Sequence, residues 1–332
     1  MNIHVWFVCV TILSCVCDVH NVPAVYKPNE NSLRYTVLAD WGGIPEFPYR
    51  TPIEKAVGNA MGKVADTFGS QFTLALGDNF YFDGVKNVDD KRFTATFEEV
   101  FLAESLQNPW YLCAGNHDHN GNISAQIEYS KRSERWNFPD TNYSKVFDIP
   151  HSNSTMLLVM IDTVILCGNT DDMILGSFLE GPIDPAKAKA QFQWIEDTLK
   201  QSKHDYIIVA GHYPVWSIAE HGPTECLVKN LKPMLEKYSV TAYFNGHDHN
   251  LQHIKDNSSV EYFVIGSGAI VDPSTEHIDN IPAGSLKFHY ADPDSLGGFA
   301  YVEVTPKNMS FTFIDATAGK DLYQTVLYPR TS

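Results

Sequence analysis

Basic residues are scarce in this 332-residue sequence, which has 24 lysines and arginines against 40 aspartates and glutamates and a formal net charge of −16. A surface of this sign repels the phosphate backbone of DNA and RNA, so the composition excludes general nucleic-acid binding. Hydrophobic residues make up 44% of the chain and charged residues 19%, which excludes the low hydrophobic content of disordered proteins. We therefore expect a globular protein with a sizeable core.

Long hydrophobic runs are also absent after residue 17, so we expect no integral membrane segment. The one early apolar run, residues 4–17, is too short to cross a bilayer comfortably and is soon followed by polar residues. This pattern is typical of a cleaved signal peptide, and we place it at residues 1–20. A buried N-terminal strand is the alternative. Export would lead to a secreted or lysosomal protein.

Cysteine is rare, and three of the six cysteines lie in or beside the apolar run. An exported chain would keep the other three, Cys113, Cys167 and Cys226. An odd number permits one disulfide and one free buried thiol in an oxidising compartment. Five N-glycosylation sequons also support export, and they begin at Asn122, Asn142, Asn153, Asn257 and Asn308.

Alternating apolar segments predict an α/β fold. The expected strands before residue 260 are Tyr35–Ala39, Phe72–Leu76, Trp110–Ala114, Met156–Ile161, Tyr206–Ala210 and Thr241–Phe244. After it we expect strands alone, at Tyr262–Ile265, Phe299–Thr305, Met309–Ile314 and Tyr323–Leu327. No linker, repeat or low-complexity segment interrupts the chain, which favours one domain at residues 30–332. Two packed mixed β-sheets flanked by helices are the simplest arrangement.

Three helices are expected between the strands. Thr51-Pro52-Ile53-Glu54 is a capping box with proline at the first helical position, which predicts a helix start. A second helix is expected to begin at Asp184-Pro185. A third is predicted over Leu227–Tyr238, with a kink at Pro233.

Polar clusters follow five of the expected strands. They are Asp40-Trp41-Gly42, Gly77-Asp78-Asn79-Phe80-Tyr81, Gly115-Asn116-His117-Asp118, Gly211-His212 and Gly246-His247-Asp248-His249. Each cluster alone could be an ordinary turn or a structural histidine. Ligands of open α/β sheets, however, bind beyond the carboxyl ends of the strands. Five clusters of metal-ligating residue types at five strand ends therefore predict a metal site.

The ordered set resembles the calcineurin-like metallophosphoesterase superfamily, whose strand ends carry Asp, Gly-Asp, Gly-Asn-His, Gly-His and Gly-His-x-His. Most members begin with Asp-x-His, whereas this sequence has Asp40-Trp41-Gly42 and offers Tyr81 in Gly-Asp-Asn-Phe-Tyr. That exchange resembles the purple acid phosphatases. Gly-Asn-His-Asp-His and Gly-His-Tyr-Pro-Val-Trp-Ser are similar to the small animal, tartrate-resistant type. The resemblance runs from about Arg34 to the C-terminus and implies the α/β/β/α sandwich of metallophosphoesterases.

The resemblance implies seven metal ligands. Three would bind Fe(III): Asp40, Tyr81 and His249. Three would bind a divalent ion, Fe(II) or alternatively Zn(II): Asn116, His212 and His247. Asp78 would bridge the two ions. The donor chemistry agrees, because carboxylate and phenolate are hard anionic ligands whereas imidazole and amide suit a borderline divalent metal.

The implied activity is hydrolysis of phosphate monoesters at acidic pH by a metal-activated hydroxide. His117 and His221 would contact the phosphate or protonate the leaving group, although either could instead orient a ligand. Small phosphate monoesters or phosphoproteins are the expected substrates of a monomeric enzyme. The residues Asp118, His119 and Asp248 are expected to be structural. The resemblance also implies that Cys167 pairs with Cys226, which leaves Cys113 as a buried free thiol.

Three questions stay open at this level. An iron-binding or redox-active secreted glycoprotein would use the same seven ligands, but it would not need His117 and His221. A phosphodiesterase or nucleotidase of the same superfamily is disfavoured by Tyr81. The long segment Gly168–Ile183 could fold over the site and repress it until it is cleaved, or it could be a packed surface excursion.

Overall fold

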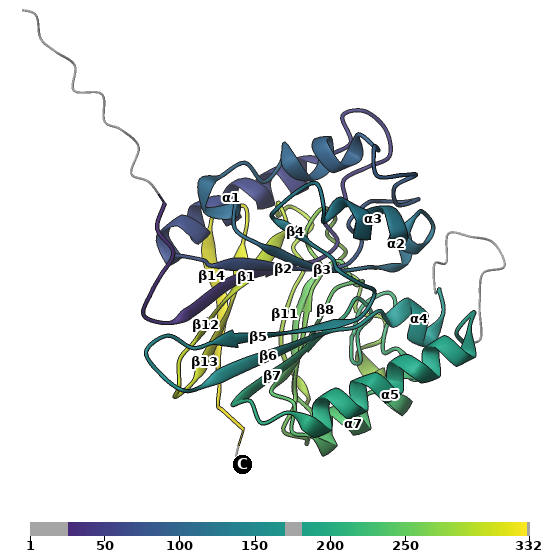
Figure 1. Ribbon diagram of the computed structural model, residues 1–332, viewed down its shortest axis with the longest axis vertical. Coiled ribbons are helices and arrows are strands. Elements are labelled where there is room, and N and C mark those ends of the chain that lie inside the picture. Colours follow the sequence, from purple (N-terminus) through teal and green to yellow (C-terminus); the bar gives the residue numbers. More distant parts are fainter. Residues whose placement is uncertain (1–25, 170–180, 331–332) are drawn as a thin grey trace, which may run out of the picture.

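Two seven-stranded β-sheets lie face to face with helices on their outer faces in the computed structural model, which describes residues 26–169 and 181–330 (Figure 1). The predicted fold class is confirmed. The first sheet has the order β14-β13-β12-β1-β2-β3-β4, with strands β1 (Leu33–Leu38), β2 (Phe72–Leu76), β3 (Trp110–Cys113), β4 (Trp136–Asn137), β12 (Gly298–Val304), β13 (Met309–Asp315) and β14 (Lys320–Leu327). The second has the order β11-β9-β10-β8-β7-β6-β5, with strands β5 (Tyr143–Asp148), β6 (Thr155–Met160), β7 (Tyr206–Ala210), β8 (Ala242–Asn245), β9 (Leu251–Ile254), β10 (Glu261–Ile265) and β11 (Leu286–Tyr290).

Both sheets are mixed. Strands β1 to β4 are parallel, and β12, β13 and β14 join them in antiparallel fashion. In the second sheet β6, β7, β8 and β10 are parallel, while β5, β9 and β11 are antiparallel additions. The parallel strands of each sheet therefore end at one edge, where the polar clusters are expected.

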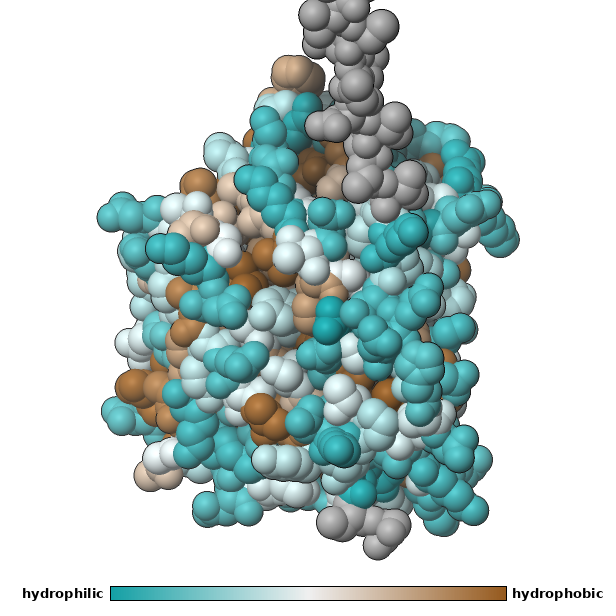
Figure 2. Space-filling view, turned by 90° about the vertical axis from the view of Figure 1, so that its left-hand side faces the viewer, coloured by the Kyte–Doolittle hydropathy of each residue, from teal (hydrophilic) through white to brown (hydrophobic). Residues whose placement is uncertain are grey.

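Side-chain alternation divides the core into three layers. In β2, Phe72, Leu74 and Leu76 point between the sheets, whereas Ala75 points to the outer face. The helices cover the outer faces. Alpha helix α1 (Pro52–Phe68) lies on the first sheet and α5 (Pro185–Gln201) on the second (Figure 1). On the face shown in Figure 2 most residues are hydrophilic, as this arrangement of the apolar side chains requires.

The shorter helices lie near the strand ends or on the outer faces: η1 (Phe93–Glu98, a π-helix), η2 (Glu104–Leu106), α2 (Asn116–His119), α3 (Ile123–Tyr129), α4 (Thr163–Cys167), α6 (Glu225–Asn230), α7 (Lys232–Lys237) and η3 (Ile278–Asn280). Within the described residues no helix is both long and apolar enough to span a membrane.

The helix starts were predicted correctly at two places. The Thr51 hydroxyl accepts the Glu54 N–H and the Glu54 carboxylate accepts the Thr51 N–H, which is the expected capping box. At the second, the Asp184 carboxylate caps α5 by accepting the N–H groups of Ala186 and Lys187. The third prediction needs correction, since residues 225–237 form two helices, α6 and α7, and not one kinked helix. Pro233 has no N–H to donate to the preceding turn, so the chain breaks before it and Pro233 lies in the first turn of α7.

Two of the sequence predictions lie outside the described residues. The proposed signal peptide falls in residues 1–25, and most of the proposed regulatory segment falls in residues 170–180.

Candidate metal centre

Each predicted polar cluster follows a strand within three residues, and the clusters meet at one edge of the two sheets. Asp40 follows β1, Asp78 follows β2 and Asn116 follows β3 in the first sheet, whereas His212 follows β7 and His247 follows β8 in the second. All five are buried. The edge is thus formed by both sheets together.

The first group of donors comprises Tyr81, Asp40 and His249. The Tyr81 hydroxyl donates to Asp40 Oδ1 at 3.0 Å and lies 3.0 Å from His249 Nε2. His249 Nε2 is in turn 3.8 Å from Asp40 Oδ1. The three donor atoms therefore converge on one point.

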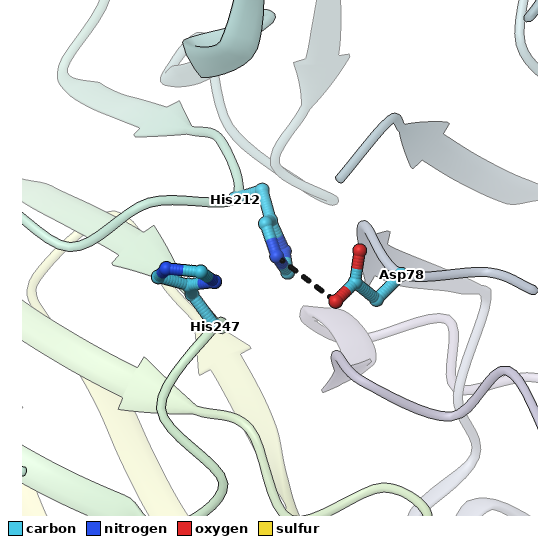
Figure 3. A group of neighbouring side chains, drawn as sticks. All are labelled: Asp78, His212 and His247. Carbon is cyan, nitrogen blue, oxygen red and sulfur yellow. Dashed lines mark ion pairs between the residues drawn. The ribbon is translucent and has the colours of Figure 1, made fainter. Parts of the chain in front are cut away.

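The second group comprises Asn116, His212, His247 and Asp78. His212 Nε2 is 3.0 Å from Asn116 Oδ1 and 3.3 Å from Asp78 Oδ2. Ligand atoms of Asp78, His212 and His247 all lie within 4.8 Å of one another, and Figure 3 shows the three side chains around a common space. The two groups adjoin, because His212 Nε2 is also 4.0 Å from Asp40 Oδ1.

Backbone contacts orient the donors. His212 Nδ1 lies 2.9 Å from the Leu76 carbonyl, which can only accept, so Nδ1 carries a proton and Nε2 faces the centre. The Asp40 carboxylate accepts the His247 N–H at 2.9 Å, which ties the first sheet to the second. Asp40, Asp78 and His247 all have positive φ angles, of 58°, 50° and 73°. Such strained backbone at a cluster of side chains is typical of functional sites.

Gly42 explains why the first cluster lacks the histidine of Asp-x-His. A Cβ at position 42 would lie 2.5 Å from Phe80 N and 2.6 Å from Asp78 O, so no side chain fits there. The Gly42 carbonyl instead accepts the Tyr81 N–H at 3.1 Å. The segment that carries Tyr81 therefore occupies the place next to Gly42, and the Tyr81 hydroxyl lies beside Asp40.

The electrostatics of the centre follow from burial. Burial raises the pKa of Asp40 well above its usual value. Burial would raise the pKa of Asp78 as well, but His212 and His117 outweigh it and hold that pKa well below the usual range. Burial and the nearby Asp40 raise the pKa of Tyr81 well above its usual value. The cluster thus holds more acidic groups than its surroundings can stabilise as anions.

The histidines of the centre divide into two kinds. Burial opposes protonation of His212, yet Asp78 and Asp40 raise its pKa to about 9. Burial and the neighbouring His221 lower the pKa of His249 to about 3 and that of His247 well below its usual value. His247 and His249 are therefore neutral imidazoles, the form in which histidine binds a metal.

The donor set fits a pair of metal ions. Among the described residues the ion-pair partners of Asp40 and Asp78 are histidines, and neither carboxylate pairs with a lysine or an arginine. Buried carboxylates are normally paired or bound to metals. Carboxylate and phenolate oxygens predominate in the first group and imidazole and amide donors in the second, as a hard and a borderline ion would require.

His117 and His221 flank the donors. His117 Nδ1 is 3.0 Å from the Phe82 carbonyl and its Nε2 is 4.0 Å from Asp78 Oδ2, so Nε2 faces the centre. The His221 ring stacks on His247 with centroids 4.0 Å apart at an angle of 19°. Both candidate residues therefore lie at the centre.

Three further polar residues, Asp118, His119 and Asp248, make contacts that support the surrounding loops and helices. Asp118 accepts the N–H groups of Gly115 and Asn79 at 2.9 and 3.0 Å. His119 Nε2 is 2.8 Å from Asp162 Oδ2, whose other oxygen caps α4. Asp248 accepts the His221 N–H at 2.9 Å. Asp162 was not singled out in the sequence, because its partner lies 43 residues away and no local motif marks it.

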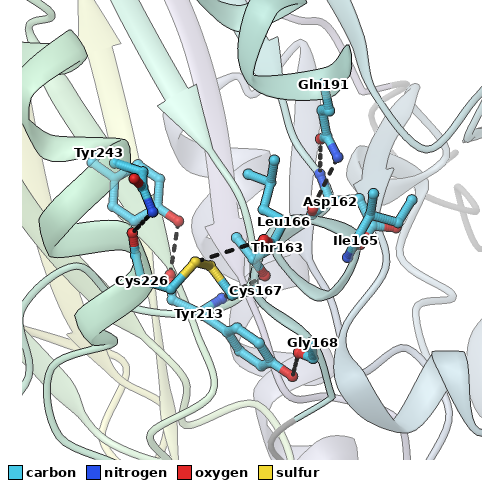
Figure 4. The surroundings of a disulfide bond; sticks show 11 residues. Asp162, Thr163, Ile165, Leu166, Cys167, Gly168, Gln191, Tyr213, Cys226 and Tyr243 are labelled. Atoms are coloured by element: carbon cyan, nitrogen blue, oxygen red, sulfur yellow. Dashed lines mark hydrogen bonds between the residues drawn. A yellow bond between two sulfur atoms is a disulfide. The ribbon is translucent and has the colours of Figure 1, made fainter. Parts of the chain in front are cut away.

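The disulfide lies beside this region. Cys167 at the end of α4 bonds to Cys226 in α6, which is the pairing that the resemblance implied (Figure 4). Cys113 is a free buried thiol. The Tyr213 hydroxyl donates to the Gly168 carbonyl at 3.2 Å and the Tyr213 N–H to the Thr163 hydroxyl at 3.0 Å. The segment after β7 is thus fixed to α4 both covalently and by hydrogen bonds.

None of the five sequon asparagines is buried. Asn122 also caps α3 by accepting the Ala125 N–H at 3.1 Å. The other four lie in or next to loops and turns at the surface.

Residues 33–251 match the model of the calcineurin-like phosphoesterase family. The chain is 53% identical over 300 residues to tartrate-resistant acid phosphatase type 5 of Oryctolagus cuniculus, covering 90% of this chain and 92% of that protein. It is 52% identical over 307 residues to the Homo sapiens protein of the same name, covering 92% and 94%. Purple acid phosphatase 7 of Arabidopsis thaliana is 28% identical over 318 residues, covering 93% and 90%.

Solved structures share the fold. GAP50, described as the anchor in the inner membrane complex of Plasmodium, is similar with a TM-score of 0.76 and 22% identity over 91% of this chain and 90% of that chain. The purple acid phosphatase PPD1 from yellow lupin seeds gives a TM-score of 0.61 and 15% identity over 91% and 54%. At these identities the likeness concerns the architecture.

Proposed function

Because the chain belongs to the purple acid phosphatases, within the calcineurin-like phosphoesterases, we propose that it is an acid phosphatase that hydrolyses phosphate monoesters at the centre described above. One observation carries the proposal. Seven buried or half-buried donors from both sheets converge on one edge, and within residues 26–169 and 181–330 the two carboxylates among them have no cationic side chain as a partner other than histidine. A dinuclear metal site suits such a set.

The proposed ligands fall into the two groups that the distances between donor atoms define. Asp40, Tyr81 and His249 would hold Fe(III), and Asp78 would bridge to the second ion. That ion, Fe(II) or alternatively Zn(II), would be held by Asn116, His212 and His247. Bound there, the ions supply positive charge for the phosphate and a hydroxide at acidic pH.

The protein's own residues would handle the phosphate and the leaving group. His117 Nε2 faces the centre, where it can contact the phosphate. His221 lies half-buried at the rim, stacked on His247, where it can pass a proton to the departing alkoxide. Iron carriage or redox cycling would need the seven ligands but neither of these histidines, so hydrolysis is favoured.

The test is a phosphatase assay with p-nitrophenyl phosphate from acidic to alkaline pH, combined with elemental analysis. We expect an acidic optimum, two metal ions per chain and poor inhibition by tartrate. His212→Ala should lower kcat at least about a hundredfold, because a direct ligand matters at least as much as the residues behind it. His151→Ala, at an exposed histidine without a motif, is the matched control. An alkaline optimum, or full activity in His212→Ala, would contradict the proposal.

The setting of the enzyme is also proposed. The disulfide and the relatives support a secreted or lysosomal protein, and the sequons Asn122, Asn142, Asn153, Asn257 and Asn308 would then carry glycans. We propose a monomer that acts on small phosphate monoesters or phosphoproteins. Comparison of kcat/KM for phosphorylated peptides, nucleotides and sugar phosphates would identify the preferred class.

A further inference from the structure

The loop between β7 and α6 carries His221, and one residue outside the loop, His277, contacts it on both sides of His221. The His277 N–H donates to the Ile218 carbonyl at 3.0 Å. His277 Nε2 lies 3.1 Å from the Glu220 carbonyl, immediately before His221. A Cβ at Gly222 would lie 2.6 Å from His277 Cγ, so the imidazole packs directly on the backbone after His221.

The His277 ring has a defined orientation. A carbonyl oxygen only accepts, so the nitrogen facing Glu220, Nε2, carries the proton. Nδ1 is then the acceptor, and the Asn280 side-chain amide lies 2.9 Å from it. The Asn280 N–H also donates to the His277 carbonyl at 2.9 Å. Both ring nitrogens and the backbone of His277 are thus engaged.

His221 is held from the opposite side by a residue next to a predicted ligand. Asp248, adjacent to His247, accepts the His221 N–H at 2.9 Å. With its backbone fixed by these contacts to Asp248 and His277, His221 stacks its imidazole on His247 with ring centroids 4.0 Å apart. Stacking over such a short distance depends on the loop backbone, because the loop places the Cα from which the ring extends.

We propose that His277 is a positioning residue for the hydrolysis: it fixes the backbone at Glu220 and Gly222 so that the His221 imidazole stays stacked on His247, within reach of the leaving group. The inference rests on the proposed function and on the role given there to His221. His277 acts on the loop backbone, and His221 acts on the substrate.

The test uses variants that separate the hydrogen bond from the packing. His277→Phe keeps a ring on Gly222 but has no donor for the Glu220 carbonyl. His277→Gln keeps an N–H donor at nearly the same reach. Asn280→Ala, at an exposed site, removes only the contact that orients the ring. Each is assayed with p-nitrophenyl phosphate, whose leaving group needs little protonation, and with glycerol 2-phosphate, whose alkoxide needs a proton.

We expect His277→Phe to lower kcat about tenfold for glycerol 2-phosphate, the size of effect seen for residues that orient others. The loss should be no more than about threefold for p-nitrophenyl phosphate, because general-acid assistance matters less there. His277→Gln should stay within about threefold of wild type on both, and Asn280→Ala should show a smaller loss with the same dependence on leaving group. In the double variant His221→Ala/His277→Phe, kcat should equal that of His221→Ala.

The outcomes separate the two hypotheses. If His221→Ala leaves hydrolysis of glycerol 2-phosphate unchanged, the role proposed for His221 fails. The positioning role of His277 is refuted if His221→Ala lowers kcat for glycerol 2-phosphate but His277→Phe and Asn280→Ala do not. It is also refuted if the losses of kcat in His221→Ala and His277→Phe multiply in the double variant. Equal losses on both substrates, or a loss of bound metal, would also refute it, since either would indicate general damage to the centre.

Discussion

Asp118 offers a quantitative test of how the metal centre is supported. Its carboxylate is buried and accepts three hydrogen bonds: from Gly115 N at 2.9 Å, from Asn79 N at 3.0 Å and from Gln126 Nε2 at 2.8 Å. The two backbone donors belong to the turns after β2 and β3, which carry Asp78 and Asn116. Asp118 thus fixes the spacing between two turns that each supply a proposed ligand.

The magnitude can be worked out from these bonds. A hydrogen bond to a charged acceptor contributes about 1.5 kcal/mol at the lower end of its range, so Asp118→Ala should lower the free energy of unfolding by about 4–5 kcal/mol. Asp118→Asn can keep both backbone bonds through its oxygen, but its NH2 then faces Gln126 Nε2. Gln126 cannot simply turn over, because its Oε1 is 3.2 Å from Asn79 Nδ2. Asp118→Asn should therefore cost about 1–3 kcal/mol, the cost of one unsatisfied buried group.

The assay is urea unfolding of the protein kept metal-free by a chelator, because bound metal would itself add stability. A separate titration measures metal affinity, which we expect to fall about 10- to 100-fold in Asp118→Ala. Asp66→Ala, at an exposed position of α1, should stay within about 0.5 kcal/mol of wild type. A loss below about 1 kcal/mol in Asp118→Ala, or a large loss of stability with unchanged metal affinity, would show that Asp118 does not hold the two turns as described.

Three further predictions concern colour, the disulfide and pH. The iron-loaded protein should show a broad visible charge-transfer band that Tyr81→Phe loses while it retains iron; a colourless wild type with two zinc ions would contradict the assignment. Replacing Cys167 and Cys226 by serine opens a loop closed over 59 residues. This should lower the free energy of unfolding, measured in urea at constant metal loading, by about 4 kcal/mol. An unchanged unfolding midpoint would refute this. Burial lowers the pKa of His119, but Asp162 outweighs it and raises that pKa above the unfolded value. The pair therefore stabilises the fold at low pH, and this contribution is lost as pH rises. The difference in free energy of unfolding between wild type and His119→Gln should be larger at about pH 5 than at about pH 9, and the opposite trend would refute this.

The central strands could be predicted from the sequence because they are buried on both faces and read as continuous apolar runs. β5, β9 and β11 could not. β5 is an edge strand whose residues are mostly exposed or half-buried, so it has no apolar run. β9 is buried but contains Gln252 and His253, whose polar atoms are satisfied by the preceding Asn250 and by Ser217, Tyr323 and Glu261 from other segments. Those partners become visible only when the chain is folded.

The sequence by itself determined the donor types of the proposed centre, because these residues and their glycine neighbours are local: Gly-Asp, Gly-Asn-His and Gly-His-Asp-His place the proposed ligands directly after strands. It also determined the exchange of a histidine for Tyr81, and the structure adds the reason, which is that Gly42 has no room for a side chain.

The tertiary structure decided which of the 13 histidines belong to the centre and which support it. His117 and His119 are two residues apart, yet His117 faces Asp78 whereas His119 turns away to Asp162, because side chains two positions apart on a helix point to nearly opposite sides. His277 lies 56 positions after His221, and no local pattern links them. They come into contact only because the loop after β7 and the segment before η3 pack together. The residues that support the centre can therefore be identified only from the folded chain.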